Sequence, residues 1–196
     1  MANVQSAFGF RQIGYLSGGA PDYQLATRAI QSTNTTKIYW GDPVIKSGAY
    51  IVQDTSTSTT ILEGIFQGCV YTPSGGTATW SPYWPGAAAV DATAYIINAP
   101  NALFLAAALN TAISSSAVGN NISFNIGTGS TVGGGFSGAT VDQSTITTNV
   151  ASAAFFPFQI VGLYNGIGNG SDPTTPFNWV ILTFTNQRFR TTTPVA

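Results

Sequence analysis

The sequence predicts an all-β protein: a compact β-barrel or sandwich-like domain with an extended N-terminal arm and little helix. Two observations favour this class. Short β-prone runs alternate with turn signals such as Gly41-Asp42-Pro43 between residues 38 and 86, which is typical of small all-β modules. Two further apolar runs, 158–164 and 179–184, lie in the last third of the chain, and no sustained helical period accompanies them.

The first 36 residues have a different pattern from the rest. Large apolar side chains stand among glycines, as in Phe8-Gly9-Phe10, and a turn-forming cluster follows at 17–22. Neither a strand period nor a helix period persists. We therefore expect residues 1–36 to form an extended arm with aromatic anchors, and residues 37–196 to form a single β domain. An ordinary first strand and loop of a barrel is the alternative for the arm.

The expected elements follow in chain order. The strands predicted by apolar runs between turn signals are 38–40, 50–52, 65–71, 78–80, 90–98, 158–164 and 179–184. Residues 102–109 fit either helix or strand, and 111–118 favour one helical turn. The glycine-rich stretch 127–138 matches no phosphate-binding spacing, so we expect a flexible surface loop there.

Charge is scarce and evenly balanced. The chain has six Lys or Arg, seven Asp or Glu, no His and a net charge of -1, and residues 47–187 contain no cation. Nucleic-acid binding needs clustered cations, so we expect none. The most apolar stretch, 102–109, is too short to span a bilayer, and no N-terminal targeting segment is apparent. We therefore expect no membrane partner, and we expect the protein to be made and assembled in a cytoplasm.

Residues suited to catalysis are few. Without histidine the commonest general base is absent, and Ser137 therefore lacks the base that a nucleophilic serine needs. Cys69 lies alone in an apolar run, which predicts a buried small side chain. We expect no enzyme activity, no cofactor and no metal site. A hydrolase with an unrecognised carboxylate pair, including Asp42 or Asp91, is the alternative.

Aromatic residues supply the candidate contact sites. Trp80, Tyr83 and Trp84 lie within five residues beside two prolines, where they could form an interface or a core. Carbohydrate stacking is a further alternative for these rings. The residues predicted to contact a partner protein or another copy of the chain, in the arm and in this cluster, are Phe8, Phe10, Arg11, Tyr15, Tyr23, Trp80, Tyr83 and Trp84.

The order of these motifs resembles that of tailed-bacteriophage head decoration proteins, also called cement or head-stabilisation proteins. The resemblance rests on AFGFRQ at 7–12, YWGDPV at 39–44, ILEGIFQGCVY at 61–71 and SPYWPG at 81–86. The turn at 17–22 adds to it, and weaker similarity continues at 119–120, 138 and 158–163. The glycine-rich insert and the longer C-terminal half depart from the shorter members.

The resemblance implies a small β-barrel-like domain that sits as a trimer on the outer surface of the expanded capsid. Its N-terminal arm would reach over neighbouring major capsid protein subunits. We therefore expect a noncatalytic viral structural protein that binds and stabilises the outside of the capsid head. A carbohydrate-binding module on the virion surface is the alternative function.

Overall fold

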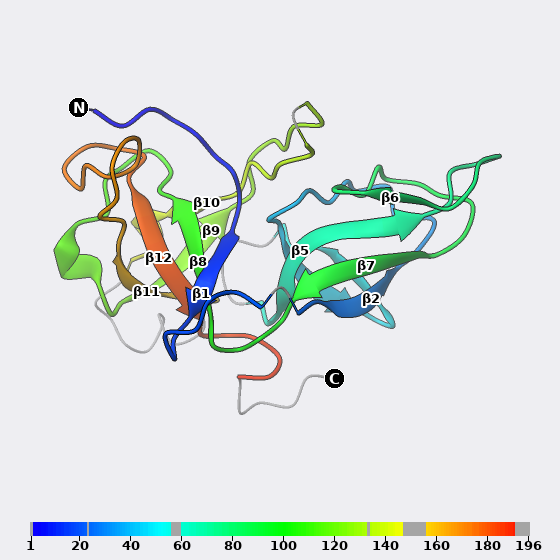
Figure 1. Cartoon of the computed structure of the whole chain (residues 1–196), viewed down its shortest axis with the longest axis horizontal. Coiled ribbons are helices and arrows are strands. Elements are labelled where there is room, and N and C mark those ends of the chain that lie inside the picture. The colour runs from blue at the N-terminus through cyan, green and yellow to red at the C-terminus, as the bar shows by residue number, and fades with distance from the viewer. Residues whose placement is uncertain (1, 23, 56–59, 133, 147–155, 191–196) are drawn as a thin grey trace.

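Two β-sheets, each around a hydrophobic core, make up the described part of the chain (Figure 1). The structure is a computed structural model, and it describes residues 2–22, 24–55, 60–132, 134–146 and 156–190. The only helices in those ranges are two short 3-10 turns, η1 (Ser115–Ala117) and η2 (Gln143–Thr145). The predicted all-β class with little helix is therefore confirmed.

The first sheet, which we call the sheet lobe, is antiparallel throughout. Its strands in spatial order are β1 (Arg11–Tyr15), β8 (Ala102–Ala107), β12 (Trp179–Phe184), β11 (Phe158–Leu163), β9 (Asn121–Asn125) and β10 (Thr140–Asp142). An isolated bridge between Ala108 and Val141 brings β10 back towards the end of β8. Buried phenylalanines dominate the core of this lobe, and Phe158 contacts four other phenylalanine rings within it, with centroid distances of 4.4–6.4 Å.

The second sheet closes into a barrel, which we call the barrel lobe. Its strands are β3 (Pro43–Ser47), β4 (Tyr50–Gln53), β2 (Ala26–Ile30), β7 (Ala92–Ile97) and β5 (Leu62–Tyr71), and β6 (Thr79–Ser81) extends the sheet beyond β5. A β3–β5 pairing closes the barrel, and β2–β4 is its parallel pair. Gly68 lies at a register shift with a φ of +139°, and a Cβ there would stand 2.9 Å from the Ser81 carbonyl oxygen, so glycine is required.

Most of the predicted strands correspond to observed ones. The runs at 50–52, 65–71, 78–80, 90–98, 158–164 and 179–184 overlap β4, β5, β6, β7, β11 and β12, respectively. The ambiguous run 102–109 contains β8, in which buried Ala102, Phe104 and Ala106 alternate with less buried residues as a strand requires. Residues 38–40 make isolated bridges instead of a strand, and β3, β9 and β10 were not predicted.

The structure differs from the expected arm over two short segments. Within residues 1–36, β1 forms one edge of the sheet lobe and β2 lies between β4 and β7 in the barrel. A bulge at residue 13 interrupts β1, and each strand has five residues, so neither produces a period that could be recognised in the sequence. Residues 37–196, expected as a single domain, are shared between the two lobes.

The residues before β1 are held against the sheet lobe by hydrogen bonds of Asn3. The Asn3 side chain donates to the Asp172 carbonyl oxygen at 2.8 Å and accepts from the Gly170 amide at 2.9 Å. Val4 adds a hydrogen bond from its amide to the Asn169 side chain at 2.6 Å. These contacts hold residues 3–4 against the loop between β11 and β12, as terminal segments need in order to be fixed.

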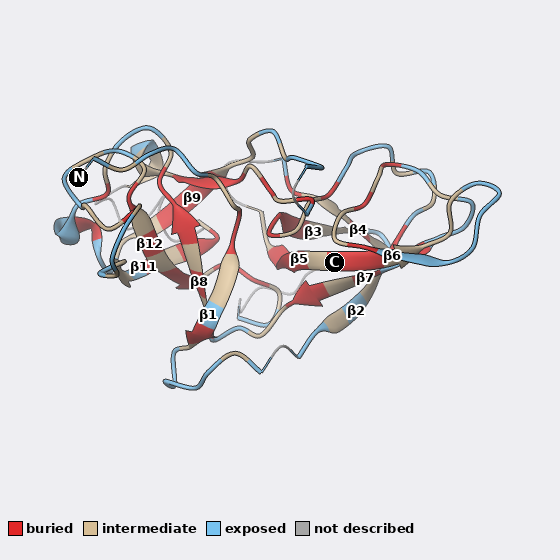
Figure 2. Cartoon of the chain, turned by 45° about the horizontal axis from the view of Figure 1, so that its top comes forward, coloured by how far each residue is buried: buried red, intermediate tan, exposed pale blue. Residues whose placement is uncertain are grey.

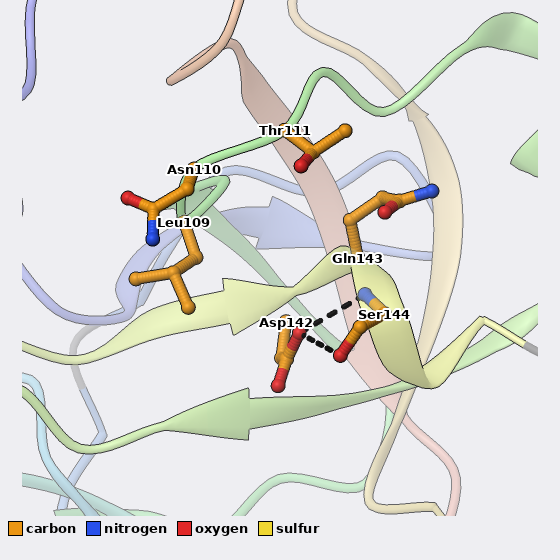
Figure 3. A pocket seen from close by; sticks show the side chains of 6 residues that line it. All are labelled: Leu109, Asn110, Thr111, Asp142, Gln143 and Ser144. Carbon is orange, nitrogen blue, oxygen red and sulfur yellow. Dashed lines mark hydrogen bonds between the residues drawn. The ribbon is translucent and has the colours of Figure 1, made fainter.

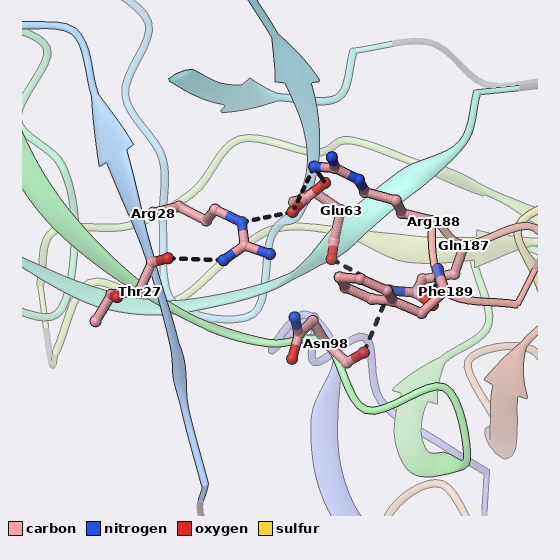
Figure 4. Close-up of polar contacts among 7 residues, drawn as sticks. All are labelled: Thr27, Arg28, Glu63, Asn98, Gln187, Arg188 and Phe189. Atoms are coloured by element: carbon pink, nitrogen blue, oxygen red, sulfur yellow. Dashed lines mark hydrogen bonds and ion pairs between the residues drawn. The ribbon is translucent and has the colours of Figure 1, made fainter. Parts of the chain in front are cut away.

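The two lobes are joined by shared packing and by polar contacts (Figures 2 and 4). Leu62, Ile65 and Ile97, from barrel strands, pack into the core of the sheet lobe. The C-terminal segment adds hydrogen bonds: the Gln187 side chain donates to the Glu63 carbonyl oxygen at 3.4 Å and to that of Asn98 at 3.2 Å. The barrel is therefore anchored to the sheet lobe through the first residues of β5 and the end of β7.

Candidate functional site

Half-buried aromatic side chains and Arg11 form a set that extends from one lobe to the other, which we call the aromatic strip. Its ring contacts fall into two groups: one runs from Tyr164 to Phe136, and the other is the stacked pair Tyr39 and Tyr83, which lies beside the first because Tyr39 precedes Trp40. Its members are Tyr164, Trp179, Phe8, Arg11, Trp40, Phe136, Tyr39 and Tyr83. In the sheet lobe, Trp179 contacts Tyr164 at a ring-centroid distance of 5.2 Å and Phe8 at 5.0 Å. Arg11 then connects Phe8 to Trp40, which lies between the barrel strands β2 and β3, and to Phe136, which lies between β9 and β10.

Arg11 is at the centre of the strip. Its guanidinium carbon lies 4.7 Å from the ring centroid of Phe136, 4.9 Å from that of Trp40 and 5.6 Å from that of Phe8. These distances are within the range of cation–π contacts. Burial lowers the pKa of Arg11 because the charged form loses solvent. Stacking on three rings therefore fixes the position of a partly desolvated cation.

The glycine-rich stretch 127–138 contacts the aromatic strip through backbone hydrogen bonds and close packing. Trp40 donates its amide to the Gly135 carbonyl oxygen at 2.9 Å, and Ser137 donates its amide to that of Trp40 at 3.0 Å. Gly135 has a φ of +72°, and a Cβ there would lie 2.7 Å from Tyr83 Cδ1. The sequence predicts a flexible surface loop here, and residues 128, 130–132 and 134 are exposed. Gly129 and Gly135 instead lie against the rings of Tyr39 and Tyr83, because glycine allows the close approach.

Three of the residues predicted as contacts belong to the strip. Phe8 and Arg11 lie on the sheet-lobe side, and Tyr83 stacks with Tyr39 at a centroid distance of 6.1 Å and an interplanar angle of 21°. The prediction omitted Trp40, Phe136 and Trp179. Their positions in strands and loops far apart in the chain gave no signal that they would meet.

Two of the predicted contact residues are core residues, which corrects those predictions. Phe10 is fully buried and stacks on Phe158 at 4.4 Å in the sheet-lobe core. Trp84 is fully buried in the barrel core, and its Nε1 donates to the Asn34 carbonyl oxygen at 3.0 Å. The physical reason is that β6 ends at Ser81 and the chain then turns to bridge Ile38, so Trp84 points inward.

The remaining predicted contacts lie elsewhere. Trp80 is 60% exposed on β6, at the edge of the barrel sheet. Tyr15 donates a hydrogen bond from its hydroxyl to Asp22 and lines a groove with Leu25 and Phe189. Tyr23 lies outside the described residues. The structure therefore does not bring Trp80 or Tyr15 together with Arg11.

A second hollow, on the sheet lobe, is lined mostly by polar residues (Figure 3). It is lined by Leu109, Asn110, Thr111, Asp142, Gln143 and Ser144. Asp142 Oδ1 accepts from the Ser144 amide at 3.0 Å and from its hydroxyl at 2.6 Å, which makes Asp142 the N-terminal cap of η2. Across the described ranges, no three His, Cys, Asp or Glu side chains gather where they could hold a metal ion.

Two buried groups have raised pKa values. Burial raises the pKa of Cys69 to about 12, and the predicted burial of this thiol is confirmed. Burial also raises the pKa of Asp42 to about 6, although hydrogen bonds from Ser137, the Tyr39 amide and Gln53 oppose the increase. Asp42 Oδ2 lies 2.7 Å from the Tyr39 nitrogen and 2.6 Å from Gln53 Nε2.

Asp42 should make stability fall as the pH rises. Its folded pKa of about 6 is above the usual aspartate pKa of 3.8, so the folded state binds the proton more tightly. The stabilisation is fully present below about pH 3.8 and is lost as the pH rises through 6. Relative to Asp42→Asn, which has no such titration, the wild type should lose about 2–3 kcal/mol of unfolding free energy over this range.

Urea unfolding of both proteins at several pH values measures this difference. Hydrogen bonds lower the pKa values of the carboxylates Asp22, Asp91 and Asp172, so these groups titrate below this pH range. They are present in both proteins, so their contribution to the free energy of unfolding is the same in each. A difference that stays constant with pH would contradict the prediction.

Comparisons with protein families, with curated proteins and with solved structures found no match. Among the described residues, no helix has the length and apolarity needed to cross a membrane.

Proposed function

We propose that this chain is a noncatalytic viral structural protein that binds the outside of an assembled capsid head. It would stabilise the head by bridging subunits of the major capsid protein. The observation that carries the proposal is the aromatic strip, which crosses from one lobe to the other with its rings half-buried. A contact surface that spans two joined lobes suits a protein that holds two neighbouring subunits together.

The chemistry of the strip supports a protein partner. Tyrosine, tryptophan and arginine are the residues that dominate the energetics of protein interfaces. The strip includes one charged residue, Arg11, and the only ion pairs among the described residues are those of Glu63, with Arg28 and Arg188. Binding would therefore rest mainly on apolar area and neutral hydrogen bonds, with Arg11 as the single charged group of the strip, multiplied by repetition over the capsid surface.

We further propose that the protein acts as a homotrimer, with β6 as a candidate contact between copies. β6 pairs only with β5 among the described strands, so its other edge is open, and Trp80 is exposed there. An open strand edge and an exposed indole both favour association.

Capsid binding should depend little on salt. Purified protein is mixed with expanded, undecorated capsids of the virus that encodes it, and bound protein is measured by sedimentation. We expect saturable binding, capsids that withstand more heat, and less than about a twofold change in occupancy between about 0.05 and 1 M NaCl. Absence of co-sedimentation would refute the proposal. A steep loss with salt would instead mean that ion pairs dominate the contact, with Arg28, Lys37 and Lys46 as anchors in addition to Arg11.

The carbohydrate-binding alternative makes a different prediction in the same system. The protein alone would bind immobilised glycans, and binding would fall when Trp80 or Tyr83 is replaced with alanine. In the structure, the amide of Gln67 beside the strip already accepts a hydrogen bond from Trp40 Nε1 at 2.7 Å and donates one to the Phe66 carbonyl oxygen at 3.1 Å. The capsid-binding proposal is therefore the one that the site supports better.

A further inference from the structure

Arg11 differs from the other arginines of the described chain in having no acceptor. Arg28 and Arg188 pair with Glu63, and Arg190 donates to the Pro100 carbonyl oxygen at 3.1 Å and to Thr183 at 3.2 Å. Within the described residues, Arg11 makes ring contacts but neither an ion pair nor a hydrogen bond from its guanidinium. Its five N–H donors are therefore free for another group.

These donors remain accessible. The buried side-chain nitrogens without a partner include Trp179 Nε1 and Gln12 Nε2, but no nitrogen of Arg11. The guanidinium edge therefore keeps contact with solvent while the rings of Phe8, Trp40 and Phe136 crowd the group. Stacked rings cover a guanidinium face and leave the in-plane N–H fork open.

The surroundings hold Arg11 in place before any ligand binds. Trp40 is fixed by the hydrogen bond of its Nε1 to Gln67 at 2.7 Å and by backbone bonds to Gly135 and Ser137. Arg11 itself is on β1, which pairs with β8. Because its orientation is largely set, binding would cost little side-chain entropy.

We propose that Arg11 binds a carboxylate supplied by the capsid protein. The partner would be an Asp or Glu side chain on a surface segment of that protein, with apolar neighbours that lie along the aromatic strip. A carboxylate matches the guanidinium fork with two parallel hydrogen bonds, and partial desolvation by the rings strengthens the pair. Charge complementarity supports this partner, since no acidic side chain of the described chain fills the position.

This inference rests on the proposed function for the identity of the partner, but the site can be tested without capsids. Phenylacetate combines a ring with a carboxylate, and phenylacetamide is its neutral counterpart. We expect phenylacetate, titrated at constant ionic strength, to shift the Arg11 Nε–H resonance and the Trp40 indole N–H resonance with saturation in the millimolar range. Phenylacetamide should bind at least about tenfold more weakly.

Variants locate the effect. Arg11→Met should abolish the saturable shift of the Trp40 resonance, and Arg11→Lys should weaken binding because lysine lacks the planar fork. Lys37→Met, which removes an exposed cation elsewhere, should bind phenylacetate as the wild type does. Equal binding of the acid and the amide, no saturable shift, or unchanged binding by Arg11→Met would each overturn the proposal. Thermal melts establish that the variants are folded. If Arg11→Met is unfolded, the weaker binding expected of Arg11→Lys tests the proposal instead.

Capsid binding separates this inference from the proposed function. If the wild type and Arg11→Met decorate capsids equally, the carboxylate contact is wrong although the capsid function stands. If phenylacetate binds at Arg11 but the wild type does not bind capsids, the carboxylate site stands and the proposed capsid function, with the partner assigned from it, fails.

Discussion

Replacing Trp84 with alanine is expected to lower the free energy of unfolding by about 3–5 kcal/mol, as for other large aromatic residues removed from a core. The Trp84 side chain is fully buried, contacts Tyr71 edge-to-face at 6.0 Å and donates to the Asn34 carbonyl oxygen at 3.0 Å. Alanine would leave a cavity in the barrel core and an unpaired carbonyl group. Urea unfolding measures the loss directly.

Trp80→Ala is the matched control, because it removes the same side chain from an exposed position four residues earlier. It should change stability by less than about 0.5 kcal/mol. If β6 forms the proposed trimer contact, the Trp80 variant should show a lower mass in light scattering, whereas folded Trp84→Ala protein should keep the wild-type mass. Equal stabilities of the two variants would contradict this assignment of core and surface.

The sequence could not distinguish these two tryptophans because it does not reveal where β6 stops. If strand alternation continued past Ser81, the rings of Trp80, Tyr83 and Trp84 could not all face one core. The strand instead ends at Ser81, where the Ser81 side chain accepts from the Tyr83 amide at 3.2 Å and starts a turn. Local propensity predicts that a turn exists, but only tertiary contacts determine which ring points inward.

The fold class was predictable because most strands carry their own local signal. Residues 65–71 and 179–184 are apolar, β-branched and bounded by turns, so each is recognisable alone. β3 and β9 carry weaker signals, since β3 begins with Pro43 and contains Lys46, and β9 includes two asparagines and a serine. Their pairing with strong strands, β3 with β5 and β9 with β11, stabilises them in spite of their composition.

The aromatic strip was predictable only in part, because it is assembled from segments distant in the chain. Phe8 and Arg11 are an aromatic and a cationic residue in the segment predicted to be an arm, whereas Phe136 lies in a stretch dominated by glycine. The contact between them depends on the way in which β1 approaches the barrel, with the Phe10 amide donating to the Gly41 carbonyl oxygen at 2.9 Å. No local pattern encodes that approach.

Glu63 is the other position where a single substitution should have a large effect. It lies in β5 with its side chain only 1% exposed, and it accepts from Arg28 Nε at 2.5 Å and from Arg188 Nη1 at 3.1 Å (Figure 4). Arg28 belongs to the barrel strand β2, whereas Arg188 follows the last strand of the sheet lobe. The same region holds the backbone bonds between Leu62 and residues 186 and 188, with N···O distances of 3.2 and 3.0 Å.

Glu63→Ala is therefore expected to cost about 3–5 kcal/mol of unfolding free energy, the range for breaking a buried ion pair. The two arginines are about one-third exposed, so water can partly replace the lost carboxylate and the result should fall near the lower end. Because Arg188 would lose its partner, hydrogen exchange of its amide should accelerate more than that of Ile96 in the barrel core.

Two further measurements test the role of the Glu63 carboxylate. Asp91→Ala, which removes an exposed carboxylate, should lower the free energy of unfolding much less than Glu63→Ala does. A double-mutant cycle of Glu63→Ala with Arg188→Ala should give a coupling of about 1–3 kcal/mol. Additive losses in that cycle would mean that Arg188 is held by its backbone alone, and that the carboxylate does not help to join the lobes.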